Sequence, residues 1–366
     1  MKKFFLLILF IASILISCTE EPPVTVEGNT YLEISASYYS NPSDTTSELL
    51  PMSYAKVILT SEYGTQIKIA DANGKLIVKG LPSSTYNISC RMYHPDDATI
   101  QLVDNQSSVL VSSGNPVISN FIGKPISSTG IAINEIYAGG PRNNIYFFYD
   151  QYVELYNQSD SVKYLDGMMV MRFSGNSDEG GLGPGADQDN DGDIDGAVYI
   201  FKFPGSPGEK NYPFQPKTFL VLASDAVNHK STVSTSIDLS SANWEFYNQY
   251  SSIDIDNPNV PNLLNMKSES TVDFLINLTS DVIILSSGVD SVWEDGIDIS
   301  SVIDGVEYQS SSSTAKTLDE RVDRGYVLSP AKYGGQSMER REPGSDTNDG
   351  TLDWEIISAP TPGYQH

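Results

Sequence analysis

The chain has 366 residues and a formal net charge of −25, with 39% hydrophobic and 19% charged residues. This length accommodates two domains with cores of their own, and the apolar content is too high for a disordered chain. A chain this acidic is repelled by nucleic acid and by anionic lipid headgroups, which excludes nucleic acid as a partner. Cations are its natural small partners.

The N-terminus carries the features of an export signal. Lys2 and Lys3 precede an apolar run over 4–16, which is shorter than the roughly 20 residues needed to span a bilayer. The run ends in Leu15-Ile16-Ser17-Cys18 and resembles the bacterial lipobox, whose cysteine is acylated. We therefore expect 1–17 to be a lipoprotein signal peptide, with an ordinary cleaved signal peptide as the alternative.

The lipid on Cys18 would anchor the chain, because each buried CH₂ contributes about 0.8 kcal/mol and several acyl chains hold stably. Residues 18–29 form a polar tether that begins Thr19-Glu20-Glu21. An acidic pair after the cysteine resembles the signal that sends lipoproteins of Bacteroidetes to the outer face of the outer membrane. This implies a lipid-anchored protein of the outer membrane, exposed at the cell surface; a periplasm-facing position is the alternative.

Residues 30–126 alternate between apolar and polar side chains in short runs separated by turn residues, which predicts a small β-sandwich. The expected strands are Tyr31 to Ser37, Ala55 to Thr60, Thr65 to Ile69, Lys75 to Val78 and Tyr86 to Met92. Asn73-Gly74 favours a tight hairpin. Cys90, left alone once Cys18 is lipidated, is expected to be a small buried hydrophobe, so a disulfide is excluded.

The order of these features resembles the carboxypeptidase-regulatory-like, prealbumin-like fold. A strand, the turn at 71–74, a second strand and the Gly80-Leu81-Pro82 motif before Tyr86 carry the resemblance, although Ala70 and Ser84 replace the family's usual Thr and Gly. The resemblance implies a spacer module, common on surface lipoproteins and TonB-dependent receptors, without peptidase activity. A polar break over 125–130 is expected to end the module.

The remaining chain, 131–366, also indicates β structure. Ile131 to Ile136 and Tyr152 to Tyr156 alternate as half-buried strands, and the apolar runs 274–276 and 283–285 suit central strands. No window shows sustained helical periodicity. The sequence therefore predicts an all-β chain with two β-sandwich domains in tandem behind the signal peptide.

This part resembles the lamin-tail domain, an immunoglobulin-like β-sandwich, and the whole arrangement resembles Bacteroidetes surface lipoproteins of undescribed function. The landmarks, in order, are Ile133-Asn134-Glu135-Ile136, Tyr152-Val153-Glu154-Leu155-Tyr156-Asn157, Leu165-Asp166-Gly167, Phe219-Leu220-Val221-Leu222, Asp304-Gly305-Val306, Ser337-Met338-Glu339-Arg340, Trp354 and Pro360-Thr361-Pro362-Gly363. Long insertions near 174–197 and 229–270 depart from the family pattern. They leave open whether these loops contact a partner or cap the sandwich.

One stretch has the composition of a metal site. Its alternating aspartates are Asp187, Asp189, Asp191, Asp193 and Asp195. Ca²⁺ takes six to eight hard oxygens, and Gly192 stands where a calcium loop bends sharply, with Ile194 expected to enter the core. The usual glutamate twelve residues into such a loop is replaced by Val198. We expect a structural calcium loop, with a solvated acidic loop as the alternative.

Two other sets of side chains are candidates for function. Glu135 and Glu154 are expected to accept hydrogen bonds from strand-end amides or from an arginine such as Arg340, and a catalytic carboxylate pair is the sharper alternative. The aromatic run 146–152 supplies Tyr146, Phe148 and Tyr149 as a possible binding platform, because tyrosine offers an apolar face and a polar tip.

No catalytic residues are assigned. The three histidines are scattered, without zinc spacing, and no nucleophile motif or phosphate-binding loop is present. We expect a non-catalytic surface lipoprotein that helps a TonB-dependent receptor capture a nutrient. The alternative is a structural or adhesion protein. A hydrolase is a third hypothesis, since lamin-tail domains are often attached to nucleases and phosphatases, but two sandwiches leave no room for an enzyme domain.

Overall fold

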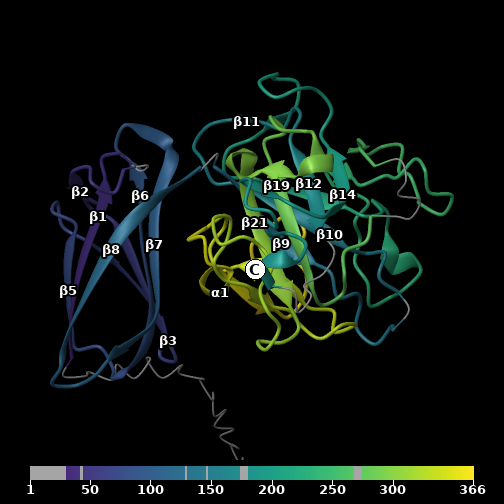
Figure 1. Ribbon diagram of the computed structural model, residues 1–366. Coiled ribbons are helices and arrows are strands. Elements are labelled where there is room, and N and C mark those ends of the chain that lie inside the picture. Colours follow the sequence, from purple (N-terminus) through teal and green to yellow (C-terminus); the bar gives the residue numbers. More distant parts are fainter. Residues whose placement is uncertain (1–29, 42–43, 128–129, 146, 174–179, 268–273) are drawn as a thin grey trace, which may run out of the picture.

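The computed structural model contains two β-rich modules that lie side by side (Figure 1). It describes residues 30–41, 44–127, 130–145, 147–173, 180–267 and 274–366. The expected signal peptide, Cys18, the tether and Tyr146 thus lie outside the described residues. Within these ranges, no helix has the length and apolar character needed to cross a membrane.

The first module is a sheet of eight strands rolled around its own core. The strands are β1 (Tyr31–Tyr39), β2 (Leu49–Pro51), β3 (Lys56–Ser61), β4 (Gly64–Ile69), β5 (Lys75–Lys79), β6 (Ser84–His94), β7 (Asp97–Val111) and β8 (Pro116–Ser127). Alternate residues of β1 are buried, as the sequence predicts. Cys90 is buried beside them in the core, as expected. Burial raises the pKa of its thiol well above its usual range.

Strand β8 joins the two layers of this module. Its first part pairs in parallel with β1, and its last part pairs antiparallel with β7. Pro125 lies opposite Leu102 within that last part, so the polar break expected over 125–130 begins only after Ser127. β8 has a neighbour on one side there, and a proline is tolerated in a strand where its missing N–H is not needed for a second ladder.

The second module is built from two six-stranded sheets. The first, in order, is β17 (Trp244–Glu245), β16 (Phe219–Ala223), β10 (Tyr152–Asn157), β9 (Ile131–Tyr137), β23 (Ser337–Arg340) and β24 (Trp354–Ile357); the second is β18 (Leu264–Asn265), β14 (Ala197–Lys202), β12 (Met169–Phe173), β19 (Asp281–Ser286), β21 (Val302–Gln309) and β22 (Val327–Leu328). The main core contains side chains from both sheets. The all-β prediction is confirmed.

Short elements complete the module. They are the strand pairs β11 (Lys163–Tyr164) with β15 (Pro213–Phe214) and β13 (Asp193–Ile194) with β20 (Ile297–Asp298), the 3₁₀ turns η1 (Gly180–Leu182), η2 (His229–Ser231), η3 (Trp293–Asp295) and η4 (Ile299–Ser301), and the helical turn α1 (Gly350–Asp353). Asp349 caps α1 by accepting a hydrogen bond from the amide of Thr351.

The two insertions cap the outer faces of the sheets. Ile194 of the first insertion and Ile297 of β20 pack with the apolar side chains of β12 and β19, while Leu239 and Val260 of the second insertion pack against β9, β10 and β16. Residues 361–366 cover Glu135 and Glu154, and every residue of β9, β10, β19 and β21 is buried. The expectation of half-buried strands is therefore wrong for this module, because the alternation of polar residues marks a second, covered face.

The apolar run at 274–276 is not a strand. Phe274 and Ile276 are buried in the main core, but the backbone of Ile276 exchanges two hydrogen bonds with the side chain of Gln151, at 2.8 and 2.9 Å. Ser224 donates to the carbonyl of Phe274 at 2.8 Å. Side chains thus satisfy the backbone groups that a ladder would otherwise pair. The other run, 283–285, lies in β19, which pairs on both sides as expected.

The modules contact each other through the loop between β23 and α1 (341–349, the inter-module loop) and through Arg324, which pairs with Asp104 at 3.4 Å. Arg91 of β6 donates to the hydroxyl of Ser345 at 2.9 Å and to the carbonyl of Asp346 at 3.1 Å. The side-chain amide of Asn105 donates to the carbonyl of Thr347 at 2.7 Å. These contacts are hydrogen bonds between polar groups, and polar interfaces are usual between domains of one chain.

Candidate functional site

A hollow of about 470 Å³ opens beside the capped outer face of the first sheet. Its walls come from the loop before β10, the segment after β16 and the stretch around 253–255. The lining is aromatic (Phe147, Tyr149), aliphatic (Val227, Ile253, Ile255) and polar (Asp225, Asn228, His229, Ser231, Thr232). A concave, largely apolar surface with a few polar groups is the usual form of a small-molecule site.

The polar wall of the hollow is held rigidly. His229 is buried, and its Nε2 lies 3.1 Å from the carbonyl oxygen of Asp225. Asn228 caps η2 by accepting a hydrogen bond from the amide of Lys230 at 3.1 Å. Burial lowers the pKa of His229, so its imidazole is neutral at pH 7.

The aromatic wall comes from the run singled out in the sequence. Phe147 meets the ring of His229 edge-on, with 5.6 Å between centroids, and Phe147 and Tyr149 are 5.9 Å apart. Phe148 stacks on Tyr149 at 5.1 Å but does not line the hollow. Of the predicted platform, the structure thus places Tyr149 in the lining and Phe148 behind it, while Tyr146 lies outside the described residues.

Sequence reasoning missed most of the hollow. His229 is one of the three scattered histidines without zinc spacing, and Ile253 and Ile255 belong to an insertion without a recognisable motif. Both isoleucines are exposed, at 63% and 52%, although β-branched apolar residues are usually buried. No local signal could have identified them, because the lining forms only when three distant segments meet.

The aspartate loop brings three of its five carboxylates together. Asp187, Asp189 and Asp191 each offer an oxygen within 4.8 Å of the others. Asp187 also accepts hydrogen bonds from the amides of Asp191 and Gly192, both at 3.1 Å. Hard carboxylate oxygens at this spacing fit a Ca²⁺ ion.

The charges of this loop are partly balanced by an arginine. Arg321 forms an ion pair with Asp187 and another with Asp319 at 2.9 Å. Its hydrogen bond lowers the pKa of Asp187. In contrast, burial and the neighbouring carboxylate of Asp191 raise the pKa of Asp189. A cation would therefore compete with Arg321 for Asp187.

The other two aspartates have different surroundings. Asp195 accepts a hydrogen bond from the amide of Gln188 at 2.9 Å. Burial, then Asp191 and the acidic residues Asp290, Asp298 and Asp295, raise the pKa of Asp193. Ile194 between them is fully buried, as predicted. The structure thus supports a three-carboxylate arrangement rather than five converging ligands.

Glu135 and Glu154 are fully buried and adjacent. They lie opposite each other on β9 and β10. The backbone amide of Thr361 donates to Glu135, and that of Gly363 donates to Glu154. Burial raises the pKa of Glu135 to about 7 and that of Glu154 to about 9. The expected amide contacts are present, but they come from a distant segment rather than from strand ends.

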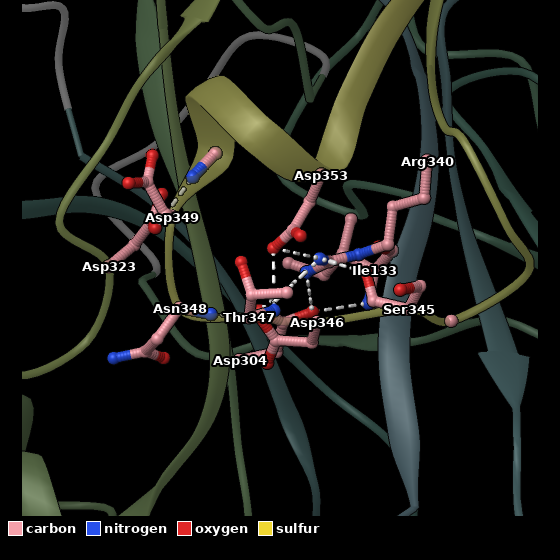
Figure 2. A network of polar contacts seen from close by, with 12 residues as sticks. Ile133, Asp304, Asp323, Arg340, Ser345, Asp346, Thr347, Asn348, Asp349 and Asp353 are labelled. Carbon is pink, nitrogen blue, oxygen red and sulfur yellow. Dashed lines mark hydrogen bonds and ion pairs between the residues drawn. The ribbon is translucent and has the colours of Figure 1, made fainter. Parts of the chain in front are cut away.

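Arg340 does not bind these glutamates, contrary to expectation. Figure 2 shows its guanidinium among aspartates: it pairs with Asp304 at 2.8 Å, Asp353 at 3.3 Å and Asp346 at 3.5 Å. It also donates to the carbonyls of Ile133 and Ser345. Arg340 is 2% exposed, so this is a buried ion network that ties β21, β23, α1 and the inter-module loop together.

The fold and the hollow define a class: an all-β protein of two tandem modules with a concave, small-molecule-sized surface on the second. Residues 215–295, which include β16 to η3 and eight of the ten lining residues, match the model of a family described as "Protein of unknown function (DUF4876)". No curated protein matches the chain.

Solved structures agree with the fold. The chain is similar to a DUF4876 family protein from Bacteroides thetaiotaomicron, with a TM-score of 0.54 and 17% identity over 89% of this chain and 94% of that one. A putative carbohydrate binding protein from Bacteroides uniformis overlaps 39% of this chain and 60% of its own, at 14% identity and a TM-score of 0.18. The first similarity shows a shared fold, and the second is too low to support an argument.

Proposed function

We propose that the protein is a non-catalytic binding protein that captures a small ligand in the hollow beside Phe147 and His229. The single observation that carries this proposal is the hollow itself. Its volume of about 470 Å³ lies within the roughly 300–1,000 Å³ typical of ligand pockets. Its rigid polar wall would fix the orientation of a ligand, and its aromatic wall would supply apolar contact.

The charge of the lining limits the class of ligand that can bind in the hollow. Among the described residues that line the hollow, none is lysine or arginine, and Asp225 contributes a carboxylate. Phosphorylated or acidic molecules would meet no opposite charge there, and the chain carries a strong net negative charge. The ligand is therefore neutral or cationic, with an apolar face and a few hydrogen-bonding groups.

Binding can be tested by calorimetry with a library of neutral sugars, amines and apolar nutrients. For any ligand found, Phe147→Ala removes the ring that contacts His229 and should weaken binding at least tenfold. Phe148→Ala is the milder comparison, because its ring lies outside the lining and reaches it only by stacking on Tyr149; it should change affinity by less than about threefold. If Phe147→Ala leaves the affinity unchanged, the ligand binds elsewhere.

At the cell, we place this binding function with a TonB-dependent receptor, on a lipid anchor at Cys18 in the outer membrane. Support comes from the signal sequence and lipobox. Crosslinking the lipidated protein in native outer membranes should recover such a receptor. Recovery of extracellular polymer or of the protein alone would instead favour the structural or adhesion role.

We also propose a domain type for each module. Residues 30–126 form a carboxypeptidase-regulatory-like domain, and residues 131–366 form a lamin-tail-like domain. The strand–turn–strand order around Asn73-Gly74 supports the first assignment. The facing sheets with Glu135 and Glu154 on neighbouring strands support the second. Calcium in the aspartate loop belongs to the same proposal, with a structural role and an affinity of about 10⁻⁴–10⁻³ M, as in other extracellular modules.

A further inference from the structure

Four glutamates stand in a row across neighbouring strands of the first sheet. Glu154 of β10 lies opposite Glu135 of β9, Glu135 opposite Glu339 of β23, and Glu339 opposite Glu355 of β24. Like charges placed directly opposite each other destabilise a sheet. The first three are 0%, 0% and 1% exposed, so solvent does not screen them. The fourth has a side chain that is 42% exposed and pairs with Arg341 at 3.2 Å.

Residues 361–366 lie across the three buried glutamates and donate hydrogen bonds to each of them. The amide of Thr361 donates to Glu135 at 3.1 Å, and its hydroxyl lies 3.2 Å from both Glu135 and Glu339. The amide of Gly363 donates to Glu154 at 2.6 Å. The amide of His366 donates to Glu339 at 3.0 Å. Three backbone amides and one hydroxyl thus hold the segment on the row.

The segment has further anchors, and they too are polar. The side-chain amide of Gln365 donates to the carbonyl of Arg340 at 2.6 Å, and that of Asn134 lies 3.2 Å from both Gln365 and Glu154. Tyr364 is exposed. Docking therefore depends on the carboxyl groups more than on apolar burial.

No lysine or arginine of the described residues forms an ion pair with the buried row. Among the ion pairs formed by described residues, none includes Glu135, Glu154 or Glu339, and the guanidinium of Arg340 is taken up by Asp304, Asp346 and Asp353. The other groups that influence the row are Tyr152 of β10, Ser337 of β23, Glu355 of β24 and His366 of the segment itself. Protonation of the carboxyl groups is therefore the remaining way to remove the negative charge of the three buried glutamates.

We infer that Glu135, Glu154 and Glu339 form a proton-dependent receptor for 361–366, which docks while these side chains hold protons and is released as they ionise. Nothing in this inference depends on the proposed ligand hollow. Release would uncover an acidic trough on the outer face of the sheet, where Figure 1 marks the end of the chain close to β9.

The direction of the pH effect follows from burial. Docked, Glu135 and Glu154 have pKa values of about 7 and about 9, and burial also raises the pKa of Glu339. Released into water, glutamates return towards the ordinary pKa near 4.3. The docked state therefore binds more protons. Docking is strongest below that ordinary pKa and weakens as pH rises through about 7 and then about 9.

Hydrogen exchange on the full chain tests the inference. The measured quantity is protection of the amides in 361–366 after correction for the intrinsic pH dependence of exchange. Protection should fall at least tenfold between pH 6 and pH 9, since one pKa unit corresponds to a factor of ten, while β10 stays protected. Unchanged protection of the segment, or loss of protection in β10 in step with it, overturns the inference.

Matched variants isolate the carboxyl groups. Glu154→Gln keeps an acceptor for Gly363 but cannot ionise, so protection should fall less by pH 9 than in the wild type, because only Glu135 and Glu339 can still lose protons. Glu355→Gln, in the same row but solvent-exposed, should behave as the wild type. Thr361→Val removes the shared hydroxyl and should lower protection already at pH 6. If Glu154→Gln loses protection like the wild type, or Thr361→Val changes nothing, the glutamates do not hold the segment.

Discussion

The glutamate row and the aspartate loop place similar carboxyl groups in opposite surroundings. Glu135, Glu154 and Glu339 are buried and receive backbone donors from 361–366. Asp187, Asp189 and Asp191 lie in a solvent-accessible loop, and the first of them pairs with Arg321. Burial penalises charge in the row, whereas water and one guanidinium accommodate it in the loop.

This difference shows that the surroundings of clustered carboxyl groups, and not the residue types alone, decide how the group behaves. Where the protein supplies hydrogen-bond donors but no cation, the carboxyl groups keep protons and respond to pH. Where it supplies converging oxygens at the surface, a metal ion can take the place of a proton. At Arg340 the charge of clustered carboxylates is compensated in a third way, by a buried guanidinium that pairs with aspartates. Four substitutions separate these cases.

The largest effect is expected from Arg340→Ala. Removing one partner of a buried ion network leaves Asp304 and Asp353 without their counter-charge, which costs about 3–5 kcal/mol of unfolding free energy. Urea unfolding measures the loss. Arg341→Ala is the control, because its pair with Glu355 is exposed and contributes less than about 1 kcal/mol. Equal losses would contradict the central role of Arg340.

Asp189→Asn tests the loop as a calcium site. Calcium at 100 times its dissociation constant should stabilise the wild type by about 2.7 kcal/mol. The variant should lose this gain, because Asp189 is one of the three converging ligands, while its metal-free unfolding free energy stays close to that of the wild type. Thermal unfolding with and without Ca²⁺ measures both quantities. Asp160→Asn, on a distant exposed turn, should keep the calcium effect.

Glu135→Gln should flatten the alkaline side of the stability curve. The pKa of Glu135 is raised by burial to about 7 in the folded chain, so the folded state binds more protons and loses stability as pH rises through 7. At pH 9 the variant should lose less of its pH 6 stability than the wild type, by at least about 1.4 kcal/mol, the equivalent of one pKa unit. A parallel decline of both proteins in urea unfolding would refute this.

The smallest change in stability is expected from Arg321→Gln. Arg321 is more than half exposed, so its loss should change the unfolding free energy by less than about 1 kcal/mol. Calcium affinity should nevertheless increase, because Asp187 is freed from its ion pair. Calorimetric titration measures this, and an unchanged or weaker affinity would show that Arg321 does not compete with the metal.

Much of the strand layout could be predicted from local pattern. The alternation at Tyr31 to Ser37 and Ile131 to Ile136 corresponds to β1 and β9, because side chains in a strand point alternately to opposite faces. The alternating pattern also predicted that Cys90 is buried, and the calcium-loop frame predicted the same of Ile194; both side chains lie in the interior. Local chemistry, however, could not give the partners of Arg340, because its aspartates come from β21, α1 and the loop between β23 and α1.

By itself the sequence determined an all-β chain, the position of most strands, the acidic loop at 187–195 and the aromatic run before β10. Only the tertiary structure decided that both faces of the central strands are covered, that Phe147, His229 and Ile253 line one hollow, and that 361–366 docks on three glutamates. The physical reason is range: strand formation follows from neighbours in the chain, whereas burial and pKa depend on segments that the fold brings together from far apart.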